Sequence, residues 1–117
     1  MSRIEQDDFV IPQGTTWAAR WPLATEDDSP LDTTGWTVRA HVKRNFDDKT
    51  ILHEWSSALG NATVFDKYVE LRITPEVSSG WKWGVPKAIY DIEITFPNGD
   101  IQRIAQGTIT LSKEVTR

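Results

Sequence analysis

The sequence of 117 residues contains no cysteine and only two histidines, His41 and His53. Without thiols the chain can form no disulfide, no cysteine-based metal site and no thiol nucleophile. The two histidines fall on separate predicted strands at solvent-facing positions, and no third ligand is spaced to complete a metal site with them. Both are therefore predicted to be surface residues, and the sequence predicts no metal and no cofactor.

Long apolar runs and clustered positive charge are also missing. No apolar stretch approaches the roughly 20 residues of a membrane-spanning helix, and the segment Met1–Asp8 is too polar for a signal peptide. The formal net charge is −4, and the lysines and arginines are scattered, which disfavours a nucleic-acid groove. We therefore expect a soluble protein made in a cytoplasm, with neither nucleic acid nor a membrane as its partner.

Patterns that mark catalytic sites are absent as well. The sequence holds no Gly-x-Ser-x-Gly nucleophile motif and no glycine-rich phosphate loop. Acidic residues cluster at 7–8, 26–28 and 47–48, but none of these runs matches the alternating oxygen ligands of a calcium-binding loop. They are interpreted as solvated loops. No catalytic residue is predicted, and the chain is not expected to be an enzyme.

The strongest structural signal is the segment Phe96-Pro97-Asn98-Gly99-Asp100-Ile101. Asn98-Gly99 between two alternating segments predicts a hairpin with a two-residue type I′ turn. That turn fixes three cross-strand pairs, namely Phe96 with Ile101, Ile92 with Ala105 and Tyr90 with Gly107. The inward faces of the two strands are predicted to hold Tyr90, Ile92, Ile94 and Phe96, and then Ile101, Ala105, Ile109 and Leu111. Arg103 is the one residue that does not fit this apolar face.

Alternation and turn residues predict further short strands at 9–11, 15–21, 36–43, 51–55, 62–65 and 68–74. The segment Thr74–Gly80 predicts one helical turn, because Thr74 can cap it, Pro75 suits its first position and Gly80 can end it. Seven or eight short strands with regular turn signals are typical of an immunoglobulin-like antiparallel β-sandwich, so the predicted fold class is all-β. We expect residues 1–7 to form a flexible arm, residues 26–30 a surface loop, and residues 8–117 a single sandwich domain.

Tryptophan is unusually frequent, with six in this short chain. Trp17 and Trp36 lie on alternating segments and are core candidates. Trp81, Lys82 and Trp83 form the candidate interface, because two tryptophans spaced two apart can project together from an extended segment. Such a pair can anchor a protein contact or stack on a sugar. The alternative is that both tryptophans cap the open end of the sandwich.

Several short segments follow one another in an order that resembles a known family. They are Gly14–Trp17, Asp32–Trp36, Val69–Thr74 with the helical turn after it, Tyr90–Glu93, Gly107–Leu111 and Val115–Arg117. This order resembles the small β-sandwich domain of virion proteins from tailed bacteriophages of the siphovirus type, especially tail, baseplate and tail-fibre-associated proteins. The resemblance covers the chain from about residue 8 to its end.

The resemblance implies a structural protein of the virion without catalytic activity, expected in the tail or at its tip. Its implied partners are other phage structural proteins and repeated copies of itself, because a virion multiplies one modest interface many times. Two alternatives stay open. One is a protein that decorates the capsid, and the other is a carbohydrate-binding module that contacts host glycans through Trp81 and Trp83.

Overall fold

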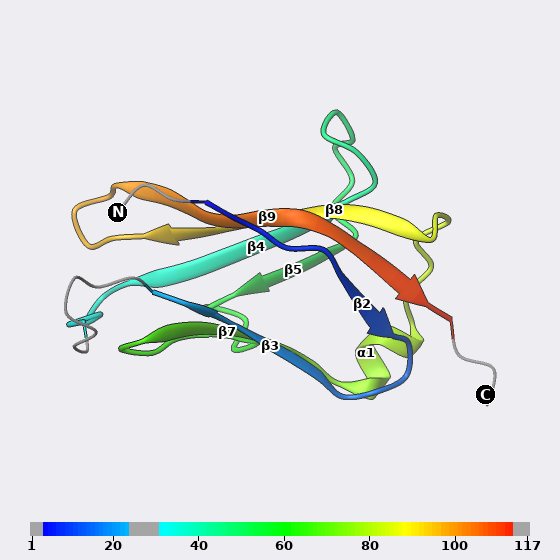
Figure 1. The fold of residues 1–117 in the computed structure, drawn as a ribbon, viewed down its shortest axis with the longest axis horizontal. Coiled ribbons are helices and arrows are strands. Elements are labelled where there is room, and N and C mark those ends of the chain that lie inside the picture. Colours follow the sequence, from blue (N-terminus) through cyan, green and yellow to red (C-terminus); the bar gives the residue numbers. More distant parts are fainter. Residues whose placement is uncertain (1–3, 24–30, 114–117) are drawn as a thin grey trace.

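A computed structural model describes residues 4–23 and 31–113 of the chain, and Figure 1 shows two β-sheets stacked face to face. The larger sheet has six strands, in which β1 and β2 both pair with β9 and the order continues through β8 and β4 to β5. The smaller sheet has the order β3-β7-β6. The strands are β1 (Glu5–Gln6), β2 (Phe9–Pro12), β3 (Trp17–Pro22), β4 (Thr37–Lys43), β5 (His53–Ser56), β6 (Ala62–Val64), β7 (Tyr68–Ile73), β8 (Lys87–Thr95) and β9 (Ile101–Ser112), and the helix α1 is Pro75–Ser79.

The predicted all-β sandwich is confirmed. The β4, β8 and β9 strands share one sheet and face β3, β7 and β6, which is the strand distribution of immunoglobulin-like sandwiches. The described residues form nine strands instead of seven or eight, because Glu5–Gln6, inside the predicted arm, pairs with β9 in parallel. Residues 1–3 of that arm, the predicted loop at 26–30 and the tail at 114–117 lie outside the described residues.

Alternation in the sequence translates directly into buried and exposed faces. Along β4, Val38, Ala40 and Val42 are at most 2% exposed, while the residues between them face outward. The same alternation along β8 buries Tyr90, Ile92 and Ile94 as predicted. The core between the sheets includes the fully buried Ile11, Trp55, Val69, Leu71 and Ile109.

The predicted helical turn is also confirmed as α1. The hydroxyl of Thr74 accepts a hydrogen bond from the N–H of Val77, and Pro75 begins the helix. The side chain of Ser78 is fully buried, and its hydroxyl accepts the N–H of Gly14 at 2.8 Å. This bond fixes α1 against the turn between β2 and β3, so that the helix closes one end of the sandwich (Figure 1).

The turn between β8 and β9 differs from the prediction. The N–H of Gly99 donates to the carbonyl of Phe96 at 2.9 Å, and the N–H of Phe96 donates to the carbonyl of Asp100 at 2.9 Å. The loop therefore has three residues, Pro97 to Gly99, and the glycine has a φ of 91°, as in hairpins built from a type I turn and a left-handed glycine. The predicted two-residue turn is wrong because it would have put Pro97, which has no N–H, into the pairing ladder.

The longer turn shifts the pairing by one residue, so Ile101 lies opposite Thr95 and not Phe96. A β-bulge then restores the predicted register, and Ile92 pairs with Ala105 as expected. Between these points Ile104 is 6% exposed, whereas Ile101 is 63% exposed and does not belong to the inward face. Because the bulge supplies one extra residue, Arg103 points outward and forms an ion pair with Asp91 at 3.5 Å.

The connection between β1 and β2, which both run parallel to β9, passes close to Gly107, and Gly107 pairs with Tyr90 as predicted. A side chain on Gly107 would collide with the carbonyl oxygen of Asp7. The hydroxyl of Tyr90 reaches the same carbonyl and donates a hydrogen bond to it at 2.7 Å, and burial raises the pKa of this hydroxyl above its ordinary value. One residue further along, the carboxylate of Asp8 accepts a hydrogen bond from the N–H of Thr108 at 2.9 Å.

The close approach of Asp7 to Gly107 predicts that Gly107→Ala destabilises the protein by about 1–3 kcal/mol, because the added methyl group must displace the N-terminal segment. Urea denaturation measures the change in the free energy of unfolding. Gly80→Ala is the matched control, because a methyl group at Gly80 meets only ordinary contacts at 3.6 Å or more. Equal stability of the two variants would contradict the close approach of strand and glycine.

Candidate functional site

All six tryptophans lie in the core or pack against it. Trp21, Trp55 and Trp83 are at most 3% exposed, and Trp17, Trp36 and Trp81 are partly buried against them. Trp55 links the two sheets, because its indole N–H on β5 donates to the carbonyl of Arg72 on β7 at 3.0 Å. The tryptophans therefore fill the sandwich together with many isoleucine and leucine side chains.

The candidate interface at Trp81, Lys82 and Trp83 does not present two exposed indoles. Trp83 is 2% exposed, Trp81 is partly buried, and only Lys82 is exposed. The two indoles stack on each other with their centroids 4.9 Å apart. The hypothesis that they project together from a loop is wrong for Trp83, and the alternative in which the pair closes the end of the sandwich fits its burial.

The two histidines have different surroundings. His41 lies on the outer face of β4, where its Nε2 is 3.1 Å from the carboxylate of Glu54. His53 is not a surface residue, because its ring packs edge-on against Trp55 at 4.6 Å and lies 5.1 Å from Trp81. Within the described part of the chain its buried Nε2 has no hydrogen-bond partner. Burial lowers the pKa of His53 to about 4, although Glu54 opposes this shift.

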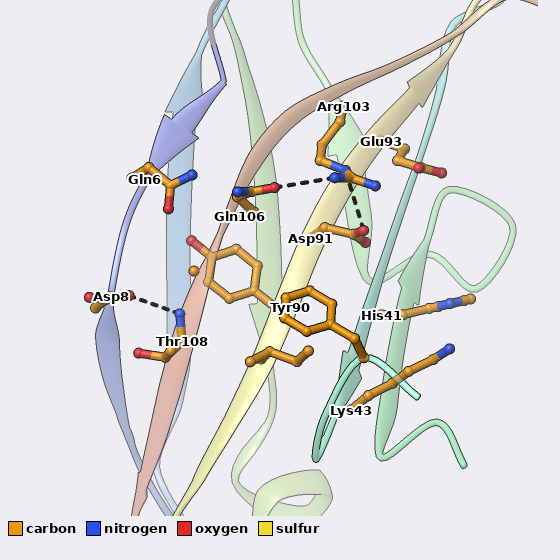
Figure 2. A pocket seen from close by; sticks show the side chains of 13 residues that line it. Gln6, Asp8, His41, Lys43, Tyr90, Asp91, Glu93, Arg103, Gln106 and Thr108 are labelled. Atoms are coloured by element: carbon orange, nitrogen blue, oxygen red, sulfur yellow. Dashed lines mark hydrogen bonds and ion pairs between the residues drawn. The ribbon is translucent and has the colours of Figure 1, made fainter. Parts of the chain in front are cut away.

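A well-defined concavity lies elsewhere, on the outer face of the larger sheet, and we call it the outer-face hollow. Its volume is about 560 Å³, within the range of ligand-binding pockets. Polar side chains from the larger sheet and from the β1–β2 connection line it (Figure 2). Its lining residues include Gln6 and Asp8 from the N-terminal strands, His41 and Lys43 from β4, Asp91 and Glu93 from β8, Arg103, Gln106 and Thr108 from β9, and Phe46 from the loop after β4.

Phe46 is the most exposed large apolar residue among those described, at 88%. It belongs to the loop between β4 and β5, which rises above the larger sheet in Figure 1. Arg44 fixes the base of this loop, because its Nε donates to the carbonyl of Trp83 at 2.7 Å and its guanidinium pairs with Asp48 at 3.3 Å. The hollow therefore has an exposed aromatic side chain, Phe46, held at its edge.

Ion pairs order part of the floor of the hollow. The guanidinium of Arg103 lies 3.5 Å from the carboxylate of Asp91 and donates to the side-chain carbonyl of Gln106 at 3.3 Å (Figure 2). Each of these contacts is partly exposed, so each contributes at most about 1 kcal/mol to stability. Their effect is to fix where the charged groups point.

Other lining groups have no partner within the described residues. Neither the ammonium of Lys43, the carboxylate of Glu93 nor the amide of Gln6 forms a hydrogen bond or ion pair with another described residue. These three groups lie on different strands and line the same hollow. They can supply donors and acceptors to a bound molecule.

Sequence reasoning missed this site. Its residues on β4 and β8, namely His41, Lys43, Asp91 and Glu93, were predicted as the outward face of a sheet, which gives no sign of a hollow. Arg103 was the misfit of the apolar face, Gln6 belonged to the predicted arm, and Phe46 was included in a polar connection. The one available signal was a lone aromatic residue in that connection, at Asn45-Phe46-Asp47-Asp48.

The burial of Trp83 predicts that Trp83→Ala destabilises the protein by about 3–5 kcal/mol. Trp83→Phe should lower the free energy of unfolding much less. It keeps an aromatic ring in the core and removes an indole N–H that has no hydrogen-bond partner in the described residues. Thermal and urea denaturation of both variants test this. Wild-type stability of Trp83→Ala would contradict a core role and restore the surface hypothesis.

The lowered pKa of His53 predicts a loss of stability in mild acid. Above about pH 6.5 the ring is neutral in both states, so His53 adds no pH dependence there. Between pH 6.5 and about 4 the unfolded chain binds a proton that the folded protein resists, which costs up to about 1.4 kcal/mol per pH unit. The free energy of unfolding should therefore fall less from pH 7 to pH 5 in His53→Phe than in the wild type. The same fall in both proteins would assign the pH dependence to other groups.

Comparison with known proteins identifies no relative, because no protein-family model and no curated protein matches the chain. No helix in the described residues is long and apolar enough to cross a membrane. The function is therefore inferred from the residues and their geometry.

Proposed function

We propose that this chain is a non-enzymatic structural protein of a tailed-phage virion, placed in the tail or at its tip. The observation that carries the proposal is where the residues of the resemblance lie in the fold. Those among the described residues lie in turns and strands of the sandwich, which is compatible with the scaffold role that the resemblance implies.

The turn before β4 illustrates this support. The carboxylate of Asp32 accepts the N–H of Thr34 at 3.2 Å and its hydroxyl at 2.7 Å, and these bonds lower the pKa of Asp32. Gly35 follows with a φ of 82°, and a side chain there would lie 3.1 Å from the ring of Pro97. The motif Asp32–Trp36 thus sets the entry to β4 and packs it against the β8–β9 turn.

A virion role needs surfaces that can form the same contact in many copies. The smaller sheet ends at β3 and β6, and the larger sheet ends at β5. Such edge strands offer backbone N–H and carbonyl groups that can pair with a strand of a neighbouring chain. Docking through edges and loops needs no catalytic residue, and repetition raises the avidity of a weak contact.

A head protein that decorates the capsid remains the second candidate, because the same edges would serve there. The structure does not favour a carbohydrate-binding module that acts through Trp81 and Trp83, because Trp83 is only 2% exposed and cannot stack on a sugar.

The proposal predicts that the chain is present in several copies in purified particles of the phage that encodes it. Quantitative mass spectrometry of density-purified particles measures the copy number, and immunogold electron microscopy locates the protein. Label on the tail or its tip is the expected result, and a major tail protein serves as the positive control. Absence from the particles would overturn the proposal, and label on the head would select the capsid alternative.

A further inference from the structure

We propose that the outer-face hollow binds a neutral polyhydroxylated ligand, a saccharide, with Phe46 as its stacking platform. This inference goes beyond a structural role and does not depend on it. It rests on the chemistry of the lining, on the balance of its charges and on the way Phe46 is held.

The lining combines apolar surface with many groups that form hydrogen bonds. Carboxylates, amides and cationic groups of the larger sheet and of the β1–β2 connection line one space of about 560 Å³ (Figure 2). A saccharide carries hydroxyl groups around its rim, and each hydroxyl both donates and accepts. Such a ligand can therefore bond to carboxylates such as Glu93 and to cationic groups such as Lys43 along the hollow.

The charges in the hollow nearly cancel. The lining contains the carboxylates of Asp8, Asp91 and Glu93 against the cationic groups of Lys43 and Arg103, with His41 beside them. An anionic ligand would meet the three carboxylates, and a cationic ligand would meet Lys43 and Arg103. The arrangement therefore favours an uncharged ligand.

A protein partner fits this lining less well. The centres of protein interfaces are depleted of charged residues, and a protein surface covering the hollow would remove Glu93 and Lys43 from water. Neither side chain has an ionic partner within the described residues, and burying an unpaired charge is costly. Hydroxyl groups of a small ligand replace water at these charges without sealing them from solvent.

Phe46 completes the site as an aromatic surface. Sugar rings present an apolar C–H face that packs on aromatic rings, and Phe46 is 88% exposed at the edge of a polar hollow. Hydrogen bonds within its loop hold it there, since the side chains of Asn45 and Asp48 accept the N–H groups of Asp47 and Thr50 at 3.1 and 3.0 Å. A platform ordered before binding reduces the entropy lost on binding.

The test uses the full chain on an array of immobilised bacterial surface oligosaccharides and neutral oligosaccharides. We expect the wild type to bind at least one saccharide and Phe46→Ala to bind it about tenfold more weakly. Phe46→Trp should keep the affinity, whereas Phe46→Leu should lose it, because leucine is apolar but has no aromatic face. Leu59→Ala is the matched control, since Leu59 is 61% exposed and lies outside the lining of the hollow.

Titration of the labelled protein with the best saccharide from the array, followed by NMR, locates the site. Amide shifts at Thr108 and around Glu93, together with weaker binding by Glu93→Ala, are the expected results. No binding to any saccharide, or equal binding by Phe46→Leu and the wild type, would overturn the inference. A protein contact at the hollow would give a different pattern. No saccharide would bind, and particles would exclude Phe46→Ala while still incorporating Phe46→Leu. Saccharide binding by a chain absent from particles would overturn only the virion role.

Discussion

The arrangement of the larger sheet depends on one constraint, which is that Arg103 must stay in water while Ile104 and Ala105 are both buried. A strand with strict alternation cannot meet this requirement, because neighbouring side chains point to opposite faces. The bulge between the pairs of Ile92 and Glu93 resolves it by adding one residue to β9. An unpaired arginine in the core would cost several kcal/mol, so the irregular pairing is the favourable solution.

The bulge also connects the core to the outer face. It turns Arg103 toward Asp91, where the ion pair forms part of the floor of the hollow. It also restores the register that places Tyr90 opposite Gly107, where a side chain would block the N-terminal strand. The close approach of the N-terminal segment to Gly107 in turn places Gln6 and Asp8 in the lining of the hollow. One extra residue in β9 thus influences both where the N-terminal strands pair and which groups line the outer-face hollow.

Much of the fold could be predicted because period-two alternation is strong in β4 and β8 and because the capping residues of α1 are local signals. The register between β8 and β9 was harder to predict from the sequence. Asn98-Gly99 outweighed Pro97 in the prediction, although Pro97 cannot donate in a ladder, and the misfit of Arg103 was itself the sign of a bulge. The one-residue shift at the turn and the one-residue bulge compensate for each other, so Tyr90 and Gly107 were paired correctly on the basis of an incorrect turn. The hollow could not be predicted, because it depends on where a loop and an N-terminal strand lie in space.

The tryptophan pair shows how a structural residue can support a site that it does not touch. Trp81 and Trp83 stack at the end of the sandwich, and Trp83 is not among the residues that line the hollow. The backbone carbonyl of Trp83 nevertheless accepts the hydrogen bond from Arg44 at 2.7 Å, and Arg44 fixes the loop that carries Phe46. Burial of the indole makes this carbonyl a rigid anchor, since a residue packed on all sides has little freedom to move. The tryptophan pair therefore acts from the end of the core, and the exposed Phe46 presents the aromatic surface.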